Sequence, residues 1–95
     1  MFFVYILQSQ KDHMFYIGYT TNVQRRFQEH NSGNNQSTES RRPFKLLYYE
    51  CHFNKNDALR RESYFKTAKG KATLRQMLRY LLLEQKIGGD TSGEK

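Results

Sequence analysis

Residues 2–30 read FFVYILQSQKDHMFYIGYTTNVQRRFQEH, and this stretch decides the fold that we expect. Two runs rich in aromatic and β-branched residues, Phe2 to Leu7 and Met14 to Tyr19, are separated by a polar segment, which predicts a β-hairpin with a longer loop. Both faces of the first run are apolar, so we expect the hairpin to be covered on both sides. Gly18 interrupts the second run and indicates a bulge or the close approach of another group.

A helix is predicted directly after the hairpin. Thr20 to Asn22 supplies N-cap candidates, and Asn31 to Gly33 is a typical helix exit. Helical spacing places Phe27 and His30 on one face, with Arg26 at its border. An arginine and a histidine are therefore expected on the side that faces the sheet.

The rest of the chain predicts a third strand and two more helices within one small domain. The fold class is α/β (α+β), with a mainly three-stranded antiparallel sheet packed by helices in the order β-β-α-β-α-α. We expect one domain over residues 1–87 and a disordered polar tail over residues 88–95. The predicted segments are a loop from Asn34 to Arg42, a strand from Phe44 to Phe53, a helix from Asn54 or Asn56 to about Thr67 that Gly70 ends, and a last helix from about Ala72 to Lys86.

The composition favours a polyanionic partner. The 95 residues include 16 Lys and Arg against 9 Asp and Glu, a net charge of +7. A solvated basic surface that keeps the protein soluble is the alternative. The candidates for contact with nucleic acid are Arg42, Arg61, Lys66, Lys69, Lys71, Arg75 and Arg79.

Other classes of protein are disfavoured. No apolar run is long enough to cross a bilayer, and the N-terminus has no signal-peptide pattern, so we expect a cytoplasmic protein. The single cysteine excludes an internal disulfide and cannot by itself build a thiolate zinc site.

Glu62 lies within the apolar stripe of the second predicted helix, on the face of Ala58 and Phe65. A carboxylate in such a place is costly unless a cation or hydrogen-bond donors meet it. It can pair with an arginine such as Arg26 or Arg61, or it can bind a hard divalent ion that prefers carboxylate oxygens.

Several of these residues together resemble the GIY-YIG nuclease family. The first tripeptide departs from the family name, because its glycine and isoleucine are Phe3 and Val4 here, but its tyrosine is retained as Tyr5. The likeness is closest to the small stand-alone bacterial members, which are similar to the N-terminal nuclease domain of excinuclease C. The matching positions are Phe3-Val4-Tyr5, Tyr16-Ile17-Gly18, Arg26, His30, Arg42-Pro43, Ala58 to Glu62, Lys66 and Gly70-Lys71.

The resemblance implies a metal-dependent endonuclease that hydrolyses phosphodiester bonds in DNA and leaves a 5′-phosphate and a 3′-hydroxyl. It implies that Glu62 binds Mg²⁺, for which Mn²⁺ can substitute, and that Arg26 steadies the scissile phosphate. Tyr5 and Tyr16 would position the attacking water and help to deprotonate it, and His30 would assist proton transfer or hold a tyrosine. A free phenol titrates near ~10, so either nearby cations favour the phenolate or the tyrosine relays its proton to His30.

Alternatives to this function remain open. Several nucleases of the family carry an asparagine after the glutamate helix, and this chain has none between Glu62 and its C-terminus. The runner-up is a non-catalytic nucleic-acid-binding module, and a third reading is a subunit whose basic face docks an acidic protein partner. In each case we expect a monomer or a weak homodimer. Branched, flapped or damaged DNA is the expected substrate, which links the protein to DNA repair or recombination. Loop or surface roles are expected for His13, Thr20, Thr38 and His52.

Overall fold

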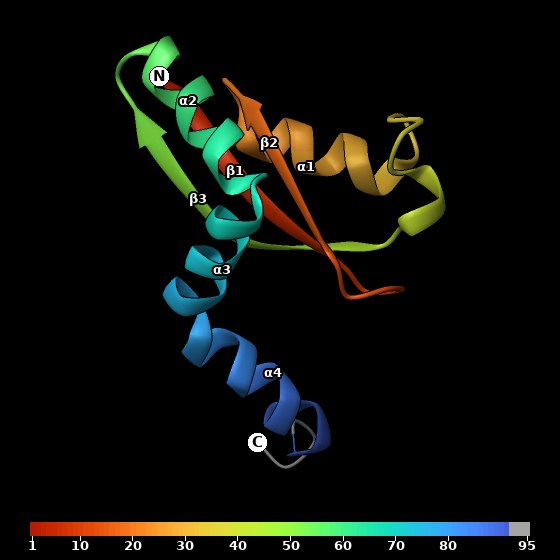
Figure 1. The fold of residues 1–95 in the computed structure, drawn as a ribbon. Helices are drawn as coiled ribbons and strands as arrows, with labels where there is room; N and C mark the ends of the chain where they lie inside the picture. Colours follow the sequence, from red (N-terminus) through yellow and green to blue (C-terminus); the bar gives the residue numbers. More distant parts are fainter. Residues whose placement is uncertain (92–95) are drawn as a thin grey trace. The chain divides into compact units, whose positions relative to one another are not determined.

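The structure, a computed structural model, describes residues 1–91, with side chains described for residues 1–85 (Figure 1). Its contacts divide the chain into two compact units, one from Met1 to Ser63 and one from Tyr64 onward. The elements are β1 (Phe2–Ser9), β2 (Phe15–Thr20), α1 (Val23–Ser32), the short 3₁₀ helix η1 (Glu39–Arg41), β3 (Phe44–His52), α2 (Lys55–Phe65), α3 (Ala68–Met77) and α4 (Arg79–Thr91).

The first unit is built on the predicted three-stranded antiparallel sheet, which the structure confirms. Its strand order is β2-β1-β3, so the first apolar run forms the central strand. The β1–β3 register shifts between Ile6 and Leu7, which pair with Tyr48 and Leu46, so Leu47 is the extra residue of a bulge. Along β1, every residue from Val4 to Ser9 is buried.

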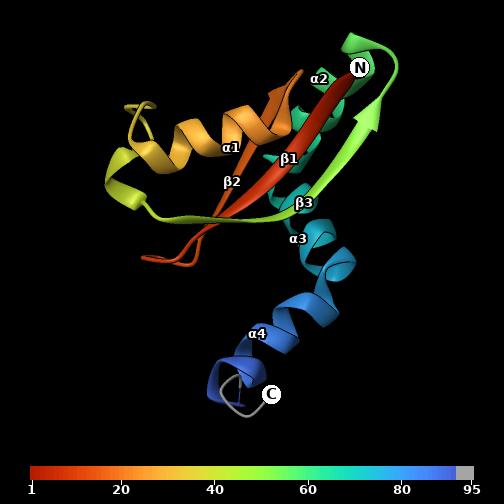
Figure 2. The same cartoon turned by 180° about the vertical axis from the view of Figure 1, so that it is seen from behind.

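The two faces of the sheet are covered by different helices, as the apolar pattern of β1 predicts. Tyr5, Leu7 and Phe44 form a core cluster against which Val23 and Phe27 of α1 pack. Figures 1 and 2 show α2 over the opposite face. There the fully buried residues include Val4, Ile6 and Ala58.

Local capping sets the ends of α1. The side chain of Asn22 accepts a hydrogen bond of 3.0 Å from the backbone N–H of Arg25, and Gly33 ends the helix at φ 86° in the left-handed region. Both ends agree with the prediction. His30 is consequently fixed on the sheet side of the helix, where it is fully buried.

The segment from Asn34 to Arg42 is more ordered than the predicted loop. It contains η1, and the Ser9 hydroxyl donates to the carbonyl of Arg41 at 2.6 Å. Thr38, for which we expected a loop or surface role, is instead fully buried. The surface prediction for Thr38 is therefore wrong, because its segment folds back and brings its hydroxyl to 2.8 Å from Nδ1 of the buried His30.

The second unit differs from the prediction at three places. The expected single last helix is two helices, α3 and α4, which break at Leu78 (φ −105°), so the observed order is β-β-α-β-α-α-α. Gly70 does not end a helix but lies in the first turn of α3, which Thr67 caps by accepting from the N–H of Gly70 at 2.9 Å. The helix α4 continues through Gly88 and Gly89 to Thr91.

The difference at Gly70 has a steric reason. A Cβ at position 70 would overlap the backbone carbonyl of Tyr64, so this glycine allows the first turn of α3 to approach the end of α2 closely. Leu78 is almost completely buried, and no proline or glycine marks the break. Of the predicted disordered tail, residues 92–95 lie outside the described residues.

No helix in the described part of the chain combines the length and the apolar character needed to cross a membrane.

Candidate active site

Tyr5 lies at the centre of the candidate site. It comes from the central strand and pairs across the hairpin with Gly18 of the edge strand β2. A Cβ at position 18 would overlap the Tyr5 ring, so the missing side chain lets the ring lie flat across β2. The phenol end of the ring thereby lies directly over Gly18, and the residue as a whole is only 1% exposed.

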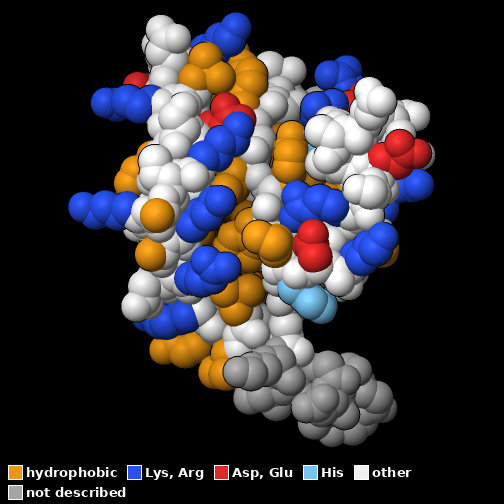
Figure 3. Space-filling model, turned by 45° about the vertical axis from the view of Figure 1, so that its right-hand side comes forward, with side chains coloured by type: hydrophobic (Ala, Val, Ile, Leu, Met, Phe, Trp, Pro, Cys, Tyr) orange, Lys and Arg blue, Asp and Glu red, His pale blue; other side chains and the backbone are white. Residues whose placement is uncertain are grey.

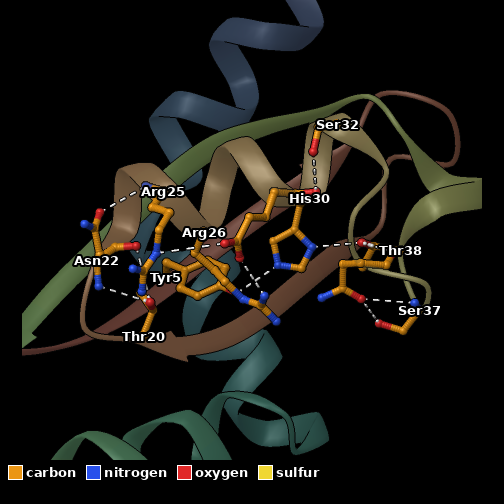
Figure 4. Close-up of polar contacts among 11 residues, drawn as sticks. Tyr5, Thr20, Asn22, Arg25, Arg26, His30, Ser32, Ser37 and Thr38 are labelled. Atoms are coloured by element: carbon orange, nitrogen blue, oxygen red, sulfur yellow. Dashed lines mark hydrogen bonds and ion pairs between the residues drawn. The ribbon is translucent and has the colours of Figure 1, made fainter.

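A line of hydrogen bonds leads from Tyr5 into the protein (Figure 4). The Tyr5 hydroxyl lies 2.9 Å from Nε2 of His30, and Nδ1 of His30 lies 2.8 Å from Oγ1 of Thr38. His30 and Thr38 are both fully buried. The buried imidazole is thus held from both nitrogens between two hydroxyl groups.

Tyr16 lies beside this line on β2. Its ring centroid is 4.7 Å from that of His30 and 6.3 Å from that of Tyr5, and Phe44 flanks the same group. Unlike Tyr5, Tyr16 is only half-buried. The site therefore has one tyrosine in the interior and one that water can reach.

Arg26 lies close to both Tyr5 and His30 in Figure 4. Its Nη1 donates to Oε1 of Glu29 at 2.9 Å, one turn further along α1, and its positive charge acts on the Tyr5 phenol. The bond to Glu29 is the main reason why the pKa of the guanidinium is raised above its ordinary value. With about a third of its side chain exposed, Arg26 can meet an anion from solution.

Glu62 is half-buried on α2, on the sheet face opposite α1, yet it acts electrostatically on Tyr5. Of the two arginines named above, Arg26 donates to Glu29, and Arg61 donates to Glu50 at 2.8 Å. No group of three or more His, Cys, Asp or Glu side chains suited to a metal occurs among the described residues. One carboxylate suits a Mg²⁺ ion, which keeps several waters and takes few protein ligands, and does not suit a fully enclosed metal.

The buried environment holds both members of the Tyr5–His30 pair neutral. Burial, followed by neighbouring Tyr16, raises the pKa of Tyr5 to about 12, although Arg26 acts in the opposite direction. Burial, followed by the Arg26 cation, lowers the pKa of His30 to about 4. At neutral pH the shared proton therefore stays on the phenol.

Comparison with known proteins decides the family. The sequence model of the GIY-YIG catalytic domain matches residues 1–76. The chain belongs to the GIY-YIG family. This is a family of nucleases, and the resemblance on which we based the sequence prediction is confirmed.

Small GIY-YIG proteins of the UPF0213 group resemble the chain over most of its length. It is 46% identical over 66 residues to a UPF0213 protein of Staphylococcus haemolyticus, covering 68% of this chain and 79% of that protein. It is 36% identical over 89 residues to one of Bacillus licheniformis, covering 93% and 87%. The solution NMR structure of a UPF0213 protein from Bacillus halodurans has a TM-score of 0.52 at 36% identity, covering 81% of this chain and 85% of that one.

Within the GIY-YIG domain, four predicted catalytic residues lie together in the first unit. Tyr5, Tyr16, Arg26 and His30 meet around one phenol, and Glu62 acts on the same group. Thr38 is the residue that sequence reasoning missed. Its polar surroundings in the sequence have no periodicity, so no local pattern signals its burial or its bond to His30.

The predicted nucleic-acid-binding residues fall into two kinds. Arg61 is half-buried, and its guanidinium ties α2 to β3 through Glu50, which also accepts from Tyr48 and lies 2.8 Å from Nε2 of His52. These bonds outweigh burial and lower the pKa of Glu50. The exposed candidates are Arg42, Lys66, Lys69, Lys71, Arg75 and Arg79.

Three of the exposed cations of the second unit are divided between two helices. Lys71 and Arg75 lie one turn apart on α3, but the break at Leu78 puts Arg79 at the start of α4. Arg79 also stacks on the ring of Tyr80 at 5.0 Å. On the face drawn in Figure 3, Lys and Arg side chains are widely spread with few acidic side chains among them.

Proposed function

We propose that this GIY-YIG protein is a metal-dependent endonuclease that hydrolyses phosphodiester bonds in DNA. The observation that carries the proposal is the hydrogen bond of 2.9 Å between the Tyr5 phenol and the His30 imidazole, with Tyr16 beside both rings. Tyr5 is hydrogen-bonded to His30, and both Arg26 and Glu62 act on its hydroxyl. Hydrolysis of a phosphodiester needs a positioned water, a proton acceptor and positive charge near the phosphorus.

The geometry favours a proton relay over a resting phenolate. A pKa of about 12 leaves Tyr5 protonated at neutral pH, so it cannot act as a base by prior ionisation. Its hydrogen bond to His30 provides an acceptor for the phenol proton. Tyr5 would accept a proton from the attacking water as it passes its own to Nε2 of His30.

The proton balance of this step is complete. The oxygen of the water forms a bond to phosphorus, the bond from phosphorus to the 3′-oxygen breaks, and His30 holds the proton that the water released. The 3′-oxygen takes a proton from solvent, so the products are a 5′-phosphate and a 3′-hydroxyl. Burial and Arg26 disfavour the His30 cation in the resting protein, and a bound phosphate anion would favour it.

The remaining residues have complementary roles in this proposal. Arg26 would hold the scissile phosphate and offset the charge that develops on it. Tyr16, which is half-buried, would hold the attacking water next to Tyr5. Glu62 would hold a Mg²⁺ ion, or Mn²⁺ in its place, and such an ion supplies charge neutralisation at the phosphate and the leaving oxygen.

The substrate would be selected by structure rather than by sequence. Residues 1–76 account for the catalytic domain, and no further recognition module follows within the described residues. A domain of this size contacts chiefly the phosphate backbone, which carries no sequence information. We therefore propose branched, flapped or damaged DNA as substrate and a role in repair or recombination.

The second candidate is a GIY-YIG module that binds nucleic acid without cleaving it. The exposed Lys and Arg side chains would support such a module as well as they support an enzyme. Docking of an acidic protein on the same cations is a third candidate. Binding that competing DNA does not displace would favour it.

The test is a cleavage assay with wild type, Glu62→Gln and the control Glu84→Gln, which changes an exposed glutamate of α4. Each protein is given end-labelled linear, flapped and four-way-branched DNA with Mg²⁺, Mn²⁺ or a chelator, and DNA binding is measured in parallel. Wild type and the control should cut with metal only. Glu62→Gln should lose at least about 100-fold in rate, the size typical for the loss of one charge-stabilising group, and should still bind DNA.

The absence of metal-dependent product from wild type on every substrate, with salt-sensitive binding intact, would favour the binding module instead. Equal cutting by Glu62→Gln and wild type would remove Glu62 from the metal site. Equal cutting of linear and branched DNA would reject structure selectivity.

A further inference from the structure

We propose that Thr38 is a positioning residue of this site: its hydroxyl selects the His30 tautomer in which Nε2 is the proton acceptor for Tyr5. The effect on cleavage rests on the proposed function, whereas the tautomer itself does not. Thr38 therefore extends the site from the sheet and α1 into the segment between α1 and β3.

The direction of the hydrogen bonds from Tyr5 to Thr38 follows from the number of hydrogens that each group can donate. A neutral imidazole has one N–H, so one ring nitrogen donates and the other accepts. The Arg26 guanidinium, which has only donors, acts electrostatically on the Tyr5 phenol. The phenol oxygen of Tyr5 can therefore accept from Arg26, while the phenol hydrogen is donated to Nε2 of His30, 2.9 Å away.

The other end of the line agrees with this direction. The Thr38 hydroxyl has one hydrogen, and it donates to the backbone carbonyl of Asn35 at 3.3 Å. Its oxygen is then free to accept from Nδ1–H of His30 at 2.8 Å. All donors thus run one way, from Tyr5 through His30 and Thr38 to Asn35, an arrangement in which each bond strengthens the next.

The choice of tautomer matters for the relay. The nitrogen that carries the hydrogen in a histidine is set by the partner of the other nitrogen. An imidazole without such a partner favours the Nε2–H form, which would donate to the Tyr5 oxygen and could not accept its proton. The Thr38 hydroxyl therefore reverses the intrinsic preference of His30 and makes Nε2 available.

The alternative is that Thr38 only anchors its segment. The structure offers a way to separate these roles, because the backbone N–H of Thr38 also donates to the Asn35 carbonyl at 3.1 Å. Thr38→Val keeps the shape of the side chain and this backbone bond but removes the hydroxyl. Thr38→Ser keeps the hydroxyl and removes one methyl group, so it is the matched control.

The experiment measures the ring ¹⁵N chemical shifts and ¹⁵N–¹H couplings of His30 in wild type, Thr38→Val and Thr38→Ser at neutral pH, and then their cleavage kinetics. Wild type and Thr38→Ser should show Nδ1–H, and Thr38→Val should shift toward Nε2–H. In cleavage, kcat of the valine variant should fall about 100-fold, the scale of one proton-transfer contribution, with KM for DNA unchanged and the serine variant near wild type.

An Nε2–H tautomer in wild type would overturn the proposal without any variant. So would a valine variant that keeps the wild-type tautomer, or one that changes tautomer but keeps the wild-type kcat. If no protein cuts DNA while the tautomers follow the expected pattern, the proposed function fails and the assignment of Thr38 as the group that sets His30 stands.

Discussion

At the scale of the residue, His30 couples the site to the stability of the fold. It is fully buried, and burial with the Arg26 cation lowers its pKa from 6.5 to about 4. A depressed histidine pKa means that the unfolded chain binds a proton more readily than the native one as the pH falls. The contribution of neutral His30 to the free energy of unfolding is thus complete above pH 6.5 and is lost as the pH falls toward about 4.

We expect the free energy of unfolding to fall more steeply between pH 6.5 and 4 in wild type than in His30→Gln. The difference between the two proteins should change by about 3 kcal/mol over that range. Urea unfolding at a series of pH values measures it. His13→Asn, which removes an exposed histidine with φ 62°, is the control and should follow wild type. Parallel curves for wild type and His30→Gln would contradict the prediction.

The same residue illustrates what the sequence could reveal about the site. Helical period and capping signals predict that Arg26 and His30 face the sheet, whereas the family resemblance groups Tyr5 and Tyr16 with them. Their chemical roles were implied by the family resemblance and remain proposals. Thr38 could not be found in this way, since its burial depends on how an aperiodic segment packs against α1 and the sheet.

At the scale of the element, the start of α3 depends on the close approach at Gly70. A glycine inside a helix ordinarily costs about 1 kcal/mol relative to alanine. Here a Cβ would overlap the Tyr64 carbonyl, which is backbone and cannot rotate away. The steric cost should therefore exceed the gain in helix propensity.

We predict that Gly70→Ala lowers the free energy of unfolding by about 1–3 kcal/mol, the usual cost of overpacking. Urea unfolding followed by circular dichroism measures the change. Lys69→Ala, at an exposed position in the same turn, should change stability by less than about 0.5 kcal/mol. An alanine variant at position 70 as stable as wild type would show that the close approach relaxes at no cost.

The sequence predicts the ends of an element where capping residues mark them. It does not predict ends that are set by packing. Asn22 and Gly33 mark the ends of α1 in the sequence itself, and the structure agrees. Leu78 has no property of a helix breaker, so a continuous helix was the natural expectation where α3 and α4 occur. Gly70 was interpreted as a helix end because a glycine needed for space looks the same in a sequence as one needed for a turn.

At the scale of the whole molecule, the net charge of +7 governs any binding of nucleic acid. Each phosphate that a Lys or Arg neutralises releases condensed counterions, so affinity falls with salt in proportion to the number of such contacts. The exposed lysines near the end of α2 and in α3 are candidates for these contacts, whereas Arg61 is engaged with Glu50.

We expect Lys66→Gln combined with Lys69→Gln to reduce the slope of log K against log salt by about 2, one for each lost contact. The control is Lys11→Gln with Lys55→Gln, which removes the same charge from exposed positions outside the predicted set. Fluorescence anisotropy with a labelled duplex at several salt concentrations measures both slopes. Equal changes in the two pairs would show that net charge, rather than these positions, sets the affinity.

The glycine beneath the Tyr5 ring has a further consequence, for how the hairpin assembles. Cross-strand partners share a face of the sheet, so a slip of β2 by one residue would put Ile17 or Tyr19 opposite Tyr5 in place of Gly18. Either side chain would occupy the space that the ring needs. A hairpin in the wrong register could not reach the native packing. The Tyr5 ring and Gly18 therefore select the native register of the hairpin. Because the Tyr5 ring itself selects the register, any chain that folds stably would already have its phenol beside His30.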